Sequence, residues 1–501
     1  MSFINNKDIS KKYICFILFL IAFAVTFSSS YNPLNFRIMY VDSSVYITVA
    51  QGIVRGHLPY KDLVDNKGPL TYLLSVPGLF LGGFTGIWIT EFILLFISVL
   101  FAYKTALFFG NKKRALFSTA FSFIALLSFL LVNAGTEEYS LPFLMISFYI
   151  FTKYFFSDKR NVSFSELVIL GFCFGCAVLI RLNMFPLWAG FCTVIFIDLI
   201  IKRSFILLGK CITGFCFGIV IIFVPVFLYL KLNGIIKPFI EQVIFAGTAR
   251  GFGDSSLKAI QKNFFLVLGR TNCALPLWLG IFWIVTKYKQ IQFTYYLGYT
   301  FSYFLMVLFL SFSGSSTHYN LVLIPFFVPA LMFLSEIIYS SFSFALINIK
   351  STKIKYVILT VFFCIMFSDG IIRYFYYLTN KLYDNSGKHL VNAGKMINEN
   401  TKPDEKIISL GINGYIYPFT KREIASRYFY QGSGLEQLYG ARDEFINDIL
   451  TSRPAIIATV TEGGRSEIIN DWHAPIVEMM EKEYRLLSDE NGFNLFIRND
   501  R

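Results

Sequence analysis

Residues 40–74 read YVDSSVYITVAQGIVRGHLPYKDLVDNKGPLTYLL and lie between two apolar runs that are each long enough to cross a bilayer. This stretch carries Asp42, Asp62, Asp65 and Lys67, so it is too polar to lie in lipid. A charged segment held between two spans must lie beside a membrane surface. We therefore interpret it as part of a reaction site at that surface.

The composition around this stretch is that of a polytopic membrane protein. Of the 501 residues, 55% are hydrophobic and 15% are charged, whereas soluble domains are about 45–50% apolar and about 25% charged. The net charge of +13 fits cationic loops on the cytoplasmic side of a membrane, and no nucleic-acid partner is expected. All eight cysteines fall inside apolar runs, so no disulfide framework is indicated.

Apolar windows of about 20 residues predict about eleven transmembrane helices. They are residues 13–27, 85–109, 115–132, 139–156, 167–180, 184–201, 205–230, 264–286, 293–311, 319–339 and 356–372. Residues 69–83 are apolar but contain two prolines and three glycines, so we expect a helix that lies at the outer interface or is half inserted, and not a full crossing. Residues 45–54 are weakly amphipathic and are interpreted in the same way.

Clusters of basic residues predict the topology. One precedes the first span, and the others follow the second, fourth, sixth, eighth and tenth spans, so all fall on one side. By the positive-inside rule this side is the cytoplasm. The N-terminus is then cytoplasmic, and the loops 31–70 and 231–263 lie outside the cell membrane.

Residues 373–501 have the composition of a soluble domain. Strands are predicted at 406–410, 455–460, 484–488 and 493–498, and helices at 437–450 and 476–482. Asn491–Gly492 predicts a two-residue hairpin. We therefore expect a transmembrane module, 1–372, followed by a small extracytoplasmic α/β domain, 373–501.

Polar residues from distant parts of the chain are predicted to meet at the outer surface. Ionisable groups near membrane depth are costly and are therefore functional candidates. The candidates are Asp42, Lys67, Glu137, Glu138, Arg181, His318 and Tyr319. Together they favour a site that has one carboxylate as a base and two or three cations for an anionic group.

Each candidate also has a purely structural interpretation. A helix N-cap explains Asp42, and the dipole of a following helix explains the two glutamates. Arg181 is placed to reach lipid headgroups, Lys67 to pair with Asp65, and His318 to act as an ordinary interfacial polar residue. The other polar residues of the first loop, Asp65 included, are more simply loop-shaping.

Such a site suits the transfer of a sugar. Nucleotide sugars are made in the cytoplasm, so a transferase that faces outwards needs a sugar carried on a polyprenyl phosphate. Asp42 would take the proton from the acceptor hydroxyl as it attacks the anomeric carbon. Lys67 and Arg181 would stabilise the negative charge on the leaving phosphate. The sequence has no HExxH and no paired CxxC, so no metal site is predicted, and the need for a divalent cation is left open.

These motifs resemble those of the GT-C superfamily of polytopic glycosyltransferases, in particular its bacterial branch related to protein O-mannosyltransferases and lipid A aminoarabinose transferase. In that family an acidic residue follows the first span, and VDSSVYITVAQGIVRG is similar, which implies that Asp42 is catalytic. NKGPLTY is similar to a segment whose lysine, here Lys67, contacts the donor phosphate. Asn66 and Gly68 depart from the acidic residue and the proline that the family has there.

The resemblance covers roughly the first 340 residues and includes three weaker segments. TEEYSLPF is similar to a second acidic site, LGFCFGCAVLIRLNMFP to a glycine-rich span that ends in a basic residue, here Arg181, and THYNLVLIPFFVPAL to a corner that faces the carrier lipid. In the C-terminal domain, SRYFYQ at 426–431 is similar to a segment that recurs in this branch. Ser43 replaces the Glu that follows the catalytic Asp in mannosyltransferases, which favours a glycan or lipid acceptor over a protein.

The sequence thus predicts an inverting glycosyltransferase that moves a sugar from a polyprenyl-phosphate donor to a cell-surface glycan, glycolipid or teichoic-type polymer. A transporter or flippase of lipid-linked glycans is the alternative. Such a protein would show repeated halves and charges along a path through the bilayer, whereas the charges here gather at one predicted face. A polymerase of surface polymers would share the lipid substrates, but its main external loop usually lies late in the chain.

Overall fold

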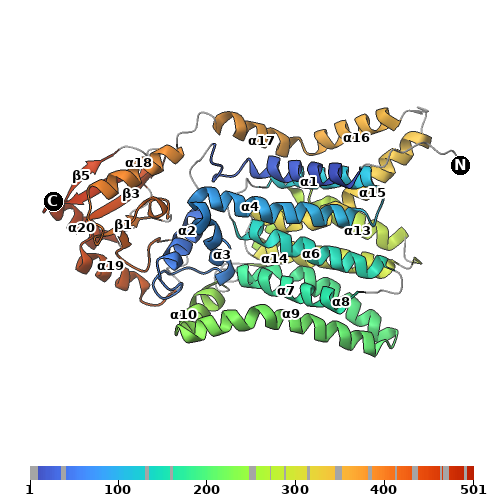
Figure 1. The fold of residues 1–501 in the computed structure, drawn as a ribbon, viewed down its shortest axis with the longest axis horizontal. Helices are drawn as coiled ribbons and strands as arrows, with labels where there is room; N and C mark the ends of the chain where they lie inside the picture. Colours follow the sequence, from blue (N-terminus) through green and yellow to red (C-terminus); the bar gives the residue numbers. More distant parts are fainter. Residues whose placement is uncertain are drawn as a thin grey trace.

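The computed structural model describes most of the chain. The described residues are 10–34, 41–129, 135–157, 162–247, 256–270, 272–286, 289–290, 292–312, 316–344, 352–381, 386–411, 414–431, 438–462, 465–466, 473–489 and 493–501. A long helical bundle and a smaller domain with a sheet follow one another along the longest axis of the molecule (Figure 1). The predicted Asn491–Gly492 hairpin turn lies outside the described residues.

The long helices of the bundle run roughly along this axis, and the shorter α2, α3 and α10 lie at the end that faces the sheet (Figure 1). The helices of this part are α1 (Lys11–Thr26), α2 (Val41–Val54), α3 (Pro69–Leu73), α4 (Val76–Ala106), α5 (Lys112–Leu127), α6 (Thr136–Phe156), α7 (Phe164–Ile180), η2 (Leu182–Met184), α8 (Pro186–Ile201), α9 (Phe205–Leu232), α10 (Ile236–Phe239), the π-helix η3 (Ile240–Ala246), α12 (Leu257–Gly269), α13 (Ala274–Thr286), α14 (Phe293–Phe312), η4 (Thr317–Leu323), α15 (Ile324–Phe344), α16 (Thr352–Met366) and α17 (Ser368–Lys381).

Among the described residues, four helices are long and apolar enough to cross a membrane: α4, α9, α14 and the continuous segment Thr317–Ile338. Two more spans result if each bent pair counts as one, namely α12 with α13, bent by 88°, and α16 with α17, bent by 71°. The sequence predicted single spans in these two places. Because α7 and α8 are apolar but only 17 and 16 residues long, the number of about eleven spans stays a prediction.

The interfacial helix predicted at residues 69–83 is divided in the structure. α3 ends at Leu73, and α4 begins at Val76 and kinks at Gly83, whose φ of +59° favours glycine. A Cβ on Gly86 would lie 1.9 Å from the Gly78 carbonyl oxygen. The start of α4 therefore turns back against the residues that follow the kink.

Small residues bring α7 and α9 into backbone contact. A Cβ on Gly171 would lie 1.9 Å from the Phe215 carbonyl oxygen, and one on Gly218 would lie 2.0 Å from that of Val168. Glycine is needed at such close approaches between helices in an apolar environment. This packing fixes the position of α7, which Arg181 follows directly.

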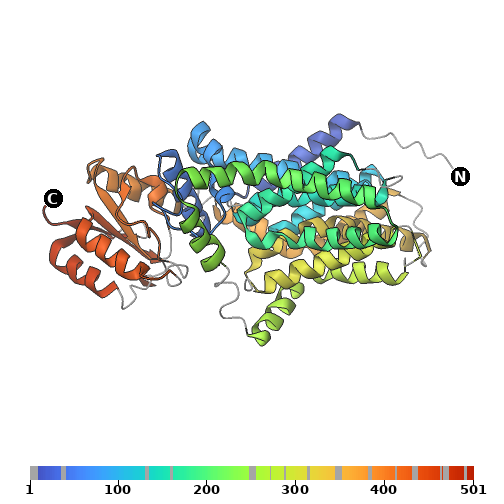
Figure 2. The ribbon, with the colours of Figure 1, turned by 90° about the horizontal axis from the view of Figure 1, so that it is seen from below.

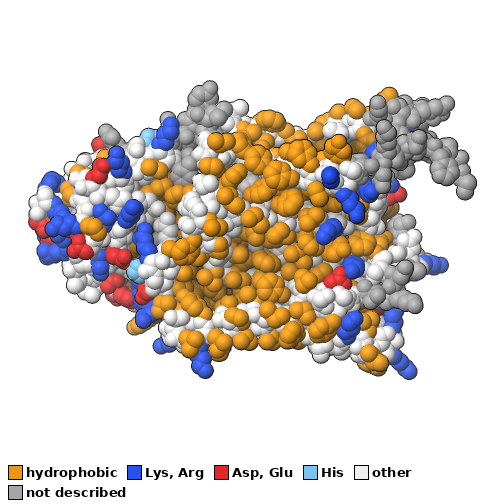
Figure 3. Space-filling model, viewed as in Figure 1, with side chains coloured by type: hydrophobic (Ala, Val, Ile, Leu, Met, Phe, Trp, Pro, Cys, Tyr) orange, Lys and Arg blue, Asp and Glu red, His pale blue; other side chains and the backbone are white. Residues whose placement is uncertain are grey.

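The outside of the bundle is apolar. Figure 3 shows hydrophobic side chains over most of the helical part on this face, and Lys and Arg side chains gathered at the end away from the sheet. On α9, for example, Phe217, Val220 and Val224 are exposed. Apolar surface of this extent is typical of a lipid-facing exterior.

The C-terminal domain is a mixed sheet with strand order β2-β1-β3-β6-β5. β1 pairs in parallel with β2 and β3, whereas β6 pairs antiparallel with β3 and β5, and β4 adds to β3. The elements are α18 (Ser386–Glu399), β1 (Lys406–Leu410), η5 (Tyr417–Phe419), β2 (Glu423–Ile424), α19 (Ala441–Ser452), β3 (Ile456–Glu462), β4 (Arg465–Ser466), α20 (Ala474–Glu483), β5 (Tyr484–Ser488) and β6 (Phe493–Arg498).

The alternation of side chains along the strands gives this sheet two apolar faces. Ile407 packs with residues of α18, whereas its neighbour Ile408 packs with residues of α19 and α20. Helices accordingly lie on both faces of the sheet (Figure 2).

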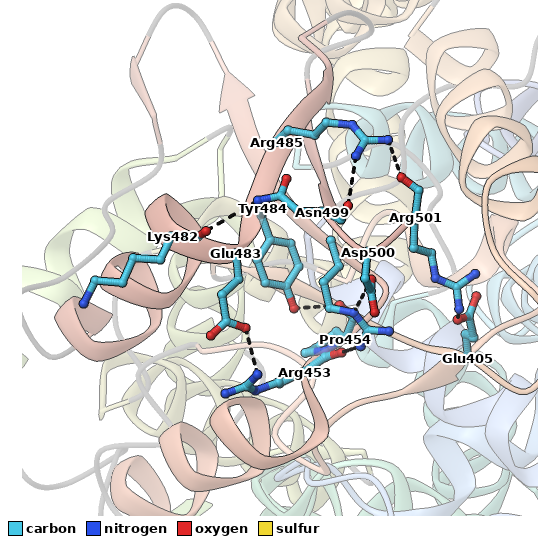
Figure 4. A network of polar contacts seen from close by, with 11 residues as sticks. Glu405, Arg453, Pro454, Lys482, Glu483, Tyr484, Arg485, Asn499, Asp500 and Arg501 are labelled. Carbon is cyan, nitrogen blue, oxygen red and sulfur yellow. Dashed lines mark hydrogen bonds and ion pairs between the residues drawn. The ribbon is translucent and has the colours of Figure 1, made fainter.

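The end of the chain is fixed to the rest of this domain by polar contacts (Figure 4). Arg453 forms an ion pair with Glu483 at 3.2 Å, and Arg501 pairs with Glu405. The Tyr484 hydroxyl donates to the Pro454 carbonyl oxygen at 2.7 Å. These contacts join the end of α19 to the end of α20 and the start of β5, and the residues after β6 to the start of β1.

The C-terminal domain docks on α2 and on the loop that follows it. The Gly414 N–H donates to Ser44 Oγ at 3.0 Å, and Arg55 donates to the Thr420 carbonyl oxygen at 3.0 Å. Further along, the Val64 N–H donates to the Arg427 carbonyl oxygen, also at 3.0 Å. The SRYFYQ segment therefore lies directly against the first loop.

Candidate active site

The predicted site residues lie at the end of the bundle that faces the C-terminal domain. Asp42 is in the first turn of α2, and Lys67 lies in the loop before α3. Glu137 is in the first turn of α6, Arg181 follows α7, and His318 is in η4. Segments that are far apart in the sequence thus contribute to one region.

The centre of this region is an ion pair between Arg181 and Glu137. Their side chains are only 15% and 5% exposed. Thr136 Oγ1 donates to the Glu137 carboxylate at 2.9 Å, and the Arg181 guanidinium lies 4.3 Å from the centre of the Tyr319 ring. Charge pairing and stacking on an aromatic face together hold the guanidinium in a fixed position.

The two adjacent glutamates have different surroundings. Glu137 contacts Arg181, whereas a Glu138 oxygen accepts the Gly135 N–H at 2.8 Å at the start of α6. Glu138 therefore contributes a helix cap, whereas the structural interpretation offered by the sequence for both residues was the dipole of this helix.

Lys67 approaches this centre from the first loop. Its Nζ donates to Asn66 Oδ1 at 2.7 Å and lies 5.9 Å from the centre of the Tyr46 ring. The Tyr60 and Tyr72 hydroxyls donate to the Lys67 carbonyl oxygen at 2.8 and 3.3 Å. Two buried tyrosines thus hold the backbone from which the Lys67 side chain extends.

Gly68 joins this loop to the end of α7. Its N–H donates to the Ile180 carbonyl oxygen at 3.1 Å, and Thr71 Oγ1 donates to the same oxygen at 3.0 Å. A Cβ on Gly68 would lie 1.9 Å from the Leu179 carbonyl oxygen. The close approach places Lys67 and Arg181, which with His318 and Tyr319 are the predicted phosphate-binding residues, one residue away from a shared backbone contact.

Replacing Gly68 by alanine is expected to separate the two cations. The new methyl group would overlap the backbone of α7, and overpacking of this kind costs about 1–3 kcal/mol. We expect a lower unfolding temperature and weaker binding of polyprenyl phosphate, measured by thermal unfolding and by native mass spectrometry. A Gly56→Ala variant is the control for a loss of stability without displacement of the backbone. Gly56 lies in the same loop and its φ of +94° strains an alanine, but no atom lies within 4 Å of the added Cβ. Normal lipid binding by Gly68→Ala would contradict the prediction.

Electrostatic coupling ties the charged groups together. Burial raises the pKa of the Tyr46 phenol well above its usual range, and the negative charges of Asp42 and Asp65 raise it further. Glu137 raises this pKa as well, whereas Arg181 lowers it. His318 is buried and lies within electrostatic reach of four charged residues, Glu137, Arg181, Asp42 and Lys67. The structure therefore brings the predicted carboxylate and the predicted cations into one electrostatic unit.

Asp42 is the exposed acid of this unit. Its neighbours Ser43 and Ser44 are buried, but Asp42 is exposed and makes no hydrogen bond or ion pair with another residue of the described part of the chain. A carboxylate in this state is available to accept a proton from a substrate hydroxyl.

Asp65 is more central than its interpretation as a loop-shaping residue suggested. Its side chain is buried, and its carboxylate accepts hydrogen bonds from the Tyr72 hydroxyl at 2.7 Å and from the Tyr430 hydroxyl at 2.8 Å. Its N–H donates to Gln242 Oε1 at 3.2 Å. Asp65 thus joins the Lys67 loop to the C-terminal domain and to η3. The sequence did not reveal this, because Tyr430 and Gln242 are distant from Asp65 in the chain.

A Tyr430→Phe substitution is expected to loosen this junction. It removes one of the two hydroxyl donors to the buried Asp65 carboxylate, and a hydrogen bond to a charged group contributes about 1.5–3 kcal/mol. We expect a lower unfolding temperature in thermal denaturation, together with faster proteolysis between the bundle and the C-terminal domain. Tyr376→Phe, at an exposed tyrosine of α17, provides the matched control. Unchanged stability would show that Tyr430 does not join the two parts.

A second buried acid was also missed. Glu91 of α4 is buried, and its Oε2 accepts a hydrogen bond from Ser29 Oγ at 2.6 Å. A lone glutamate in an apolar run gives no indication of its partner, which lies after the first helix. This contact fixes the chain that leads from α1 towards the first loop.

Among the described residues, no group of three or more His, Cys, Asp or Glu side chains is arranged to hold a metal ion. Cys173 and Cys176, the CxxC of the sequence, are buried inside α7. These two cysteines therefore take part in helix packing.

Comparisons with known proteins give likeness in structure alone. No family model matches the sequence, and no curated protein matches it. ArnT from Cupriavidus metallidurans bound to undecaprenyl phosphate is similar over 97% of this chain and 98% of its own, with a TM-score of 0.61 and 13% identity. Its apo form has a TM-score of 0.60 and 12% identity over the same shares. The apo oligosaccharyltransferase of Archaeoglobus fulgidus has a TM-score of 0.50 and 12% identity, over 90% of this chain and 70% of its own.

The similarity to ArnT spans nearly the whole of both chains and so includes the bundle, the first loop and the C-terminal domain. At this identity, likeness establishes the fold and leaves the activity to be argued from the site. The resemblance that the sequence motifs indicated is confirmed at this level: the chain has the fold of the GT-C glycosyltransferases.

Proposed function

We propose that this protein is an inverting glycosyltransferase of the cell membrane, which moves a sugar from a polyprenyl-phosphate donor to an acceptor on the outer face. The observation that carries the proposal is the grouping of one exposed carboxylate, Asp42, with the cations Lys67 and Arg181 at one end of the bundle. The fold supports it, since ArnT has been crystallised with undecaprenyl phosphate.

In this proposal, Asp42 accepts the proton of the acceptor hydroxyl as its oxygen bonds to the anomeric carbon. The bond between that carbon and the phosphate oxygen breaks, and the polyprenyl phosphate leaves with one more negative charge. Lys67 and Arg181 stabilise this charge, since both are only partly exposed and their interaction with it is weakly screened.

Glu137 serves to orient Arg181. A guanidinium has five N–H donors in a fixed plane, so pairing of one edge with Glu137 leaves other donors for a phosphate. Tyr319 lies against the face of the same group. His318, which is buried beside them, completes the pocket for the lipid phosphate.

The orientation in the membrane follows from charge. Cationic side chains gather at the end of the bundle away from the C-terminal domain (Figure 3), and the positive-inside rule assigns that end to the cytoplasm. The site and the C-terminal domain then face outwards, where lipid-linked sugars are the available donors. The acceptor is a cell-surface glycan, glycolipid or teichoic-type polymer.

The test is a comparison of cells with and without the gene. Mass spectrometry of surface glycans and polyprenyl lipids should show a missing sugar on one surface glycan and accumulation of the corresponding polyprenyl-phosphate sugar. The purified protein should form the missing product from that lipid. If the protein were a transporter or flippase of lipid-linked glycans, its loss would instead leave the lipid on the cytoplasmic face of the membrane. The purified protein would then transfer no sugar. An unchanged glycan profile would contradict the proposed function.

A further inference from the structure

We propose that the acceptor is a saccharide that binds in a cleft between η3 and the C-terminal domain, and that this cleft leads it to the lipid-phosphate site. The inference rests on the proposed function and assigns a task to the C-terminal domain. The cleft has a volume of about 470 Å³. Its bundle side is lined by Glu241, Gln242, Phe245 and Ala246 of η3, and its domain side by Arg427, Tyr428 and Tyr439.

Two aromatic side chains are exposed on opposite walls of the cleft. Phe245 of η3 is 64% exposed, and Tyr439, just before α19, is fully exposed. Large apolar groups at a surface are costly in water and mark binding sites when they flank a cavity. A flat aromatic ring can stack on the apolar C–H face of a sugar, while neighbouring polar groups bind the sugar hydroxyls.

Polar groups beside the rings match the hydroxyls of a sugar. Glu241 offers acceptors from η3, and Arg427 offers donors from the domain beside its contacts with Glu444 and Tyr428. Arg427 forms an ion pair with Glu444 at 2.6 Å, and Glu241 lies 3.9 Å from Lys237, so the lining carries no excess of one sign. A neutral or zwitterionic saccharide fits this lining better than a strongly anionic ligand, for which cations would dominate.

The cleft continues towards the cationic site. A smaller adjoining cavity of about 20 Å³, which has room for about one water molecule, is lined by Asp65 and Asn66, and it shares Gln242, Ala246 and Leu438 with the main cleft. The oxygen of Asn66 accepts the hydrogen bond from Lys67 Nζ at 2.7 Å. Asn66 therefore lines the smaller cavity and also contacts Lys67, a cation of the donor site.

The bundle wall of the cleft is fixed to the first loop. Gln242 donates to the Tyr60 carbonyl oxygen at 2.7 Å and accepts from the Asp65 N–H at 3.2 Å. It lies in η3, which is a π-helix of seven residues. π-Helices are rare and frequently occur at functional sites. Here the π-helix holds Gln242 against the first loop while Phe245 lines the cleft.

The test separates acceptor binding from donor binding. The protein is placed in nanodiscs of phosphatidylglycerol and phosphatidylcholine, with the polyprenyl-lipid fraction of cells that lack the gene as donor and their glycan and glycolipid fraction as acceptor. Tyr439→Ala and Phe245→Ala should each raise the half-saturating acceptor concentration about tenfold, which corresponds to about 1.4 kcal/mol. Binding of undecaprenyl phosphate, followed by native mass spectrometry, should not change. Leu486→Ala, at an exposed position on β5 outside the cleft, is the control.

A second variant, compared before and after labelling, tests whether filling the cleft blocks transfer. Tyr439→Cys is labelled with a bulky maleimide and compared with wild type treated in the same way, since the wild type has cysteines of its own. Labelling should abolish transfer and leave lipid binding intact. If wild type transfers sugar and neither the alanine variants nor the label alters acceptor use, the cleft is not the acceptor site and the proposed function stands. If wild type neither binds the lipid nor transfers sugar, both proposals fall.

Discussion

Replacing Asp42 by asparagine is expected to abolish measurable sugar transfer, a loss of about 10²–10⁴-fold for the removal of a general base. Asparagine has almost the same size as aspartate but cannot accept the proton. Asp42 is exposed, and within the described part of the chain it makes no hydrogen bond or ion pair. The exchange therefore removes no hydrogen bond or ion pair among the described residues, and expression and unfolding temperature should stay as in wild type.

The measurement is transfer of sugar by purified protein at saturating donor and acceptor, so that the turnover rate reports the chemical step. Binding of undecaprenyl phosphate should persist in Asp42→Asn, because the cations are intact. Asp62→Asn is the matched control from the same loop, where the side chain accepts the Leu58 N–H at 2.7 Å and an amide oxygen can do the same. Full activity of Asp42→Asn would remove the assignment of Asp42 as the base.

The second large effect is expected at Arg181. Replacing it by methionine leaves the Glu137 carboxylate buried without its cation, and breaking a buried pair in this way costs about 3–5 kcal/mol. We expect a strongly lowered unfolding temperature and loss of polyprenyl-phosphate binding. A loss of binding in this variant alone would not separate a role in binding from a role in folding.

A double variant, Arg181→Met with Glu137→Gln, separates the two roles. It leaves no unpaired charge, so most of the lost stability should return, since buried ion pairs contribute little net stability compared with neutral replacements. Lipid binding should not return, because the cation that contacts the phosphate is still missing. Thermal unfolding and native mass spectrometry on the four proteins of this cycle measure both effects. Recovery of lipid binding in the double variant would restrict Arg181 to a structural role.

Local pattern predicted much of the fold. The strands 406–410, 484–488 and 493–498 were predicted at the limits that the structure has, because a short run of apolar and β-branched residues between turn signals is visible in a short window. Apolar length in the same way located the helices of the bundle. Hydropathy gives the length of an apolar run but not the direction of the helix axis along it. The two spans that the structure breaks, at 264–286 and 356–372, therefore looked continuous in the sequence.

The candidate site was predicted in part for the same reason. Asp42, Lys67 and Arg181 were recognisable because a charge beside an apolar run is conspicuous. Glu137 and Glu138 could not be told apart, since adjacent residues share one local environment in the sequence, and only the packing of α6 against the end of α7 brings Glu137 to Arg181. Asp65 was undervalued because its partner Tyr430 is 365 residues away.

The sequence by itself determined that the chain is a polytopic helical protein with a small α/β domain, and that charges flank its apolar helices. These properties depend on composition and on periodicity, which neighbouring residues carry. Only the tertiary structure decided which charges meet, that Gly68 locks the Lys67 loop onto α7, and that the C-terminal domain forms one wall of a cleft. Such contacts depend on how helices cross and domains dock, and their partners are too distant along the chain for any local pattern to record them.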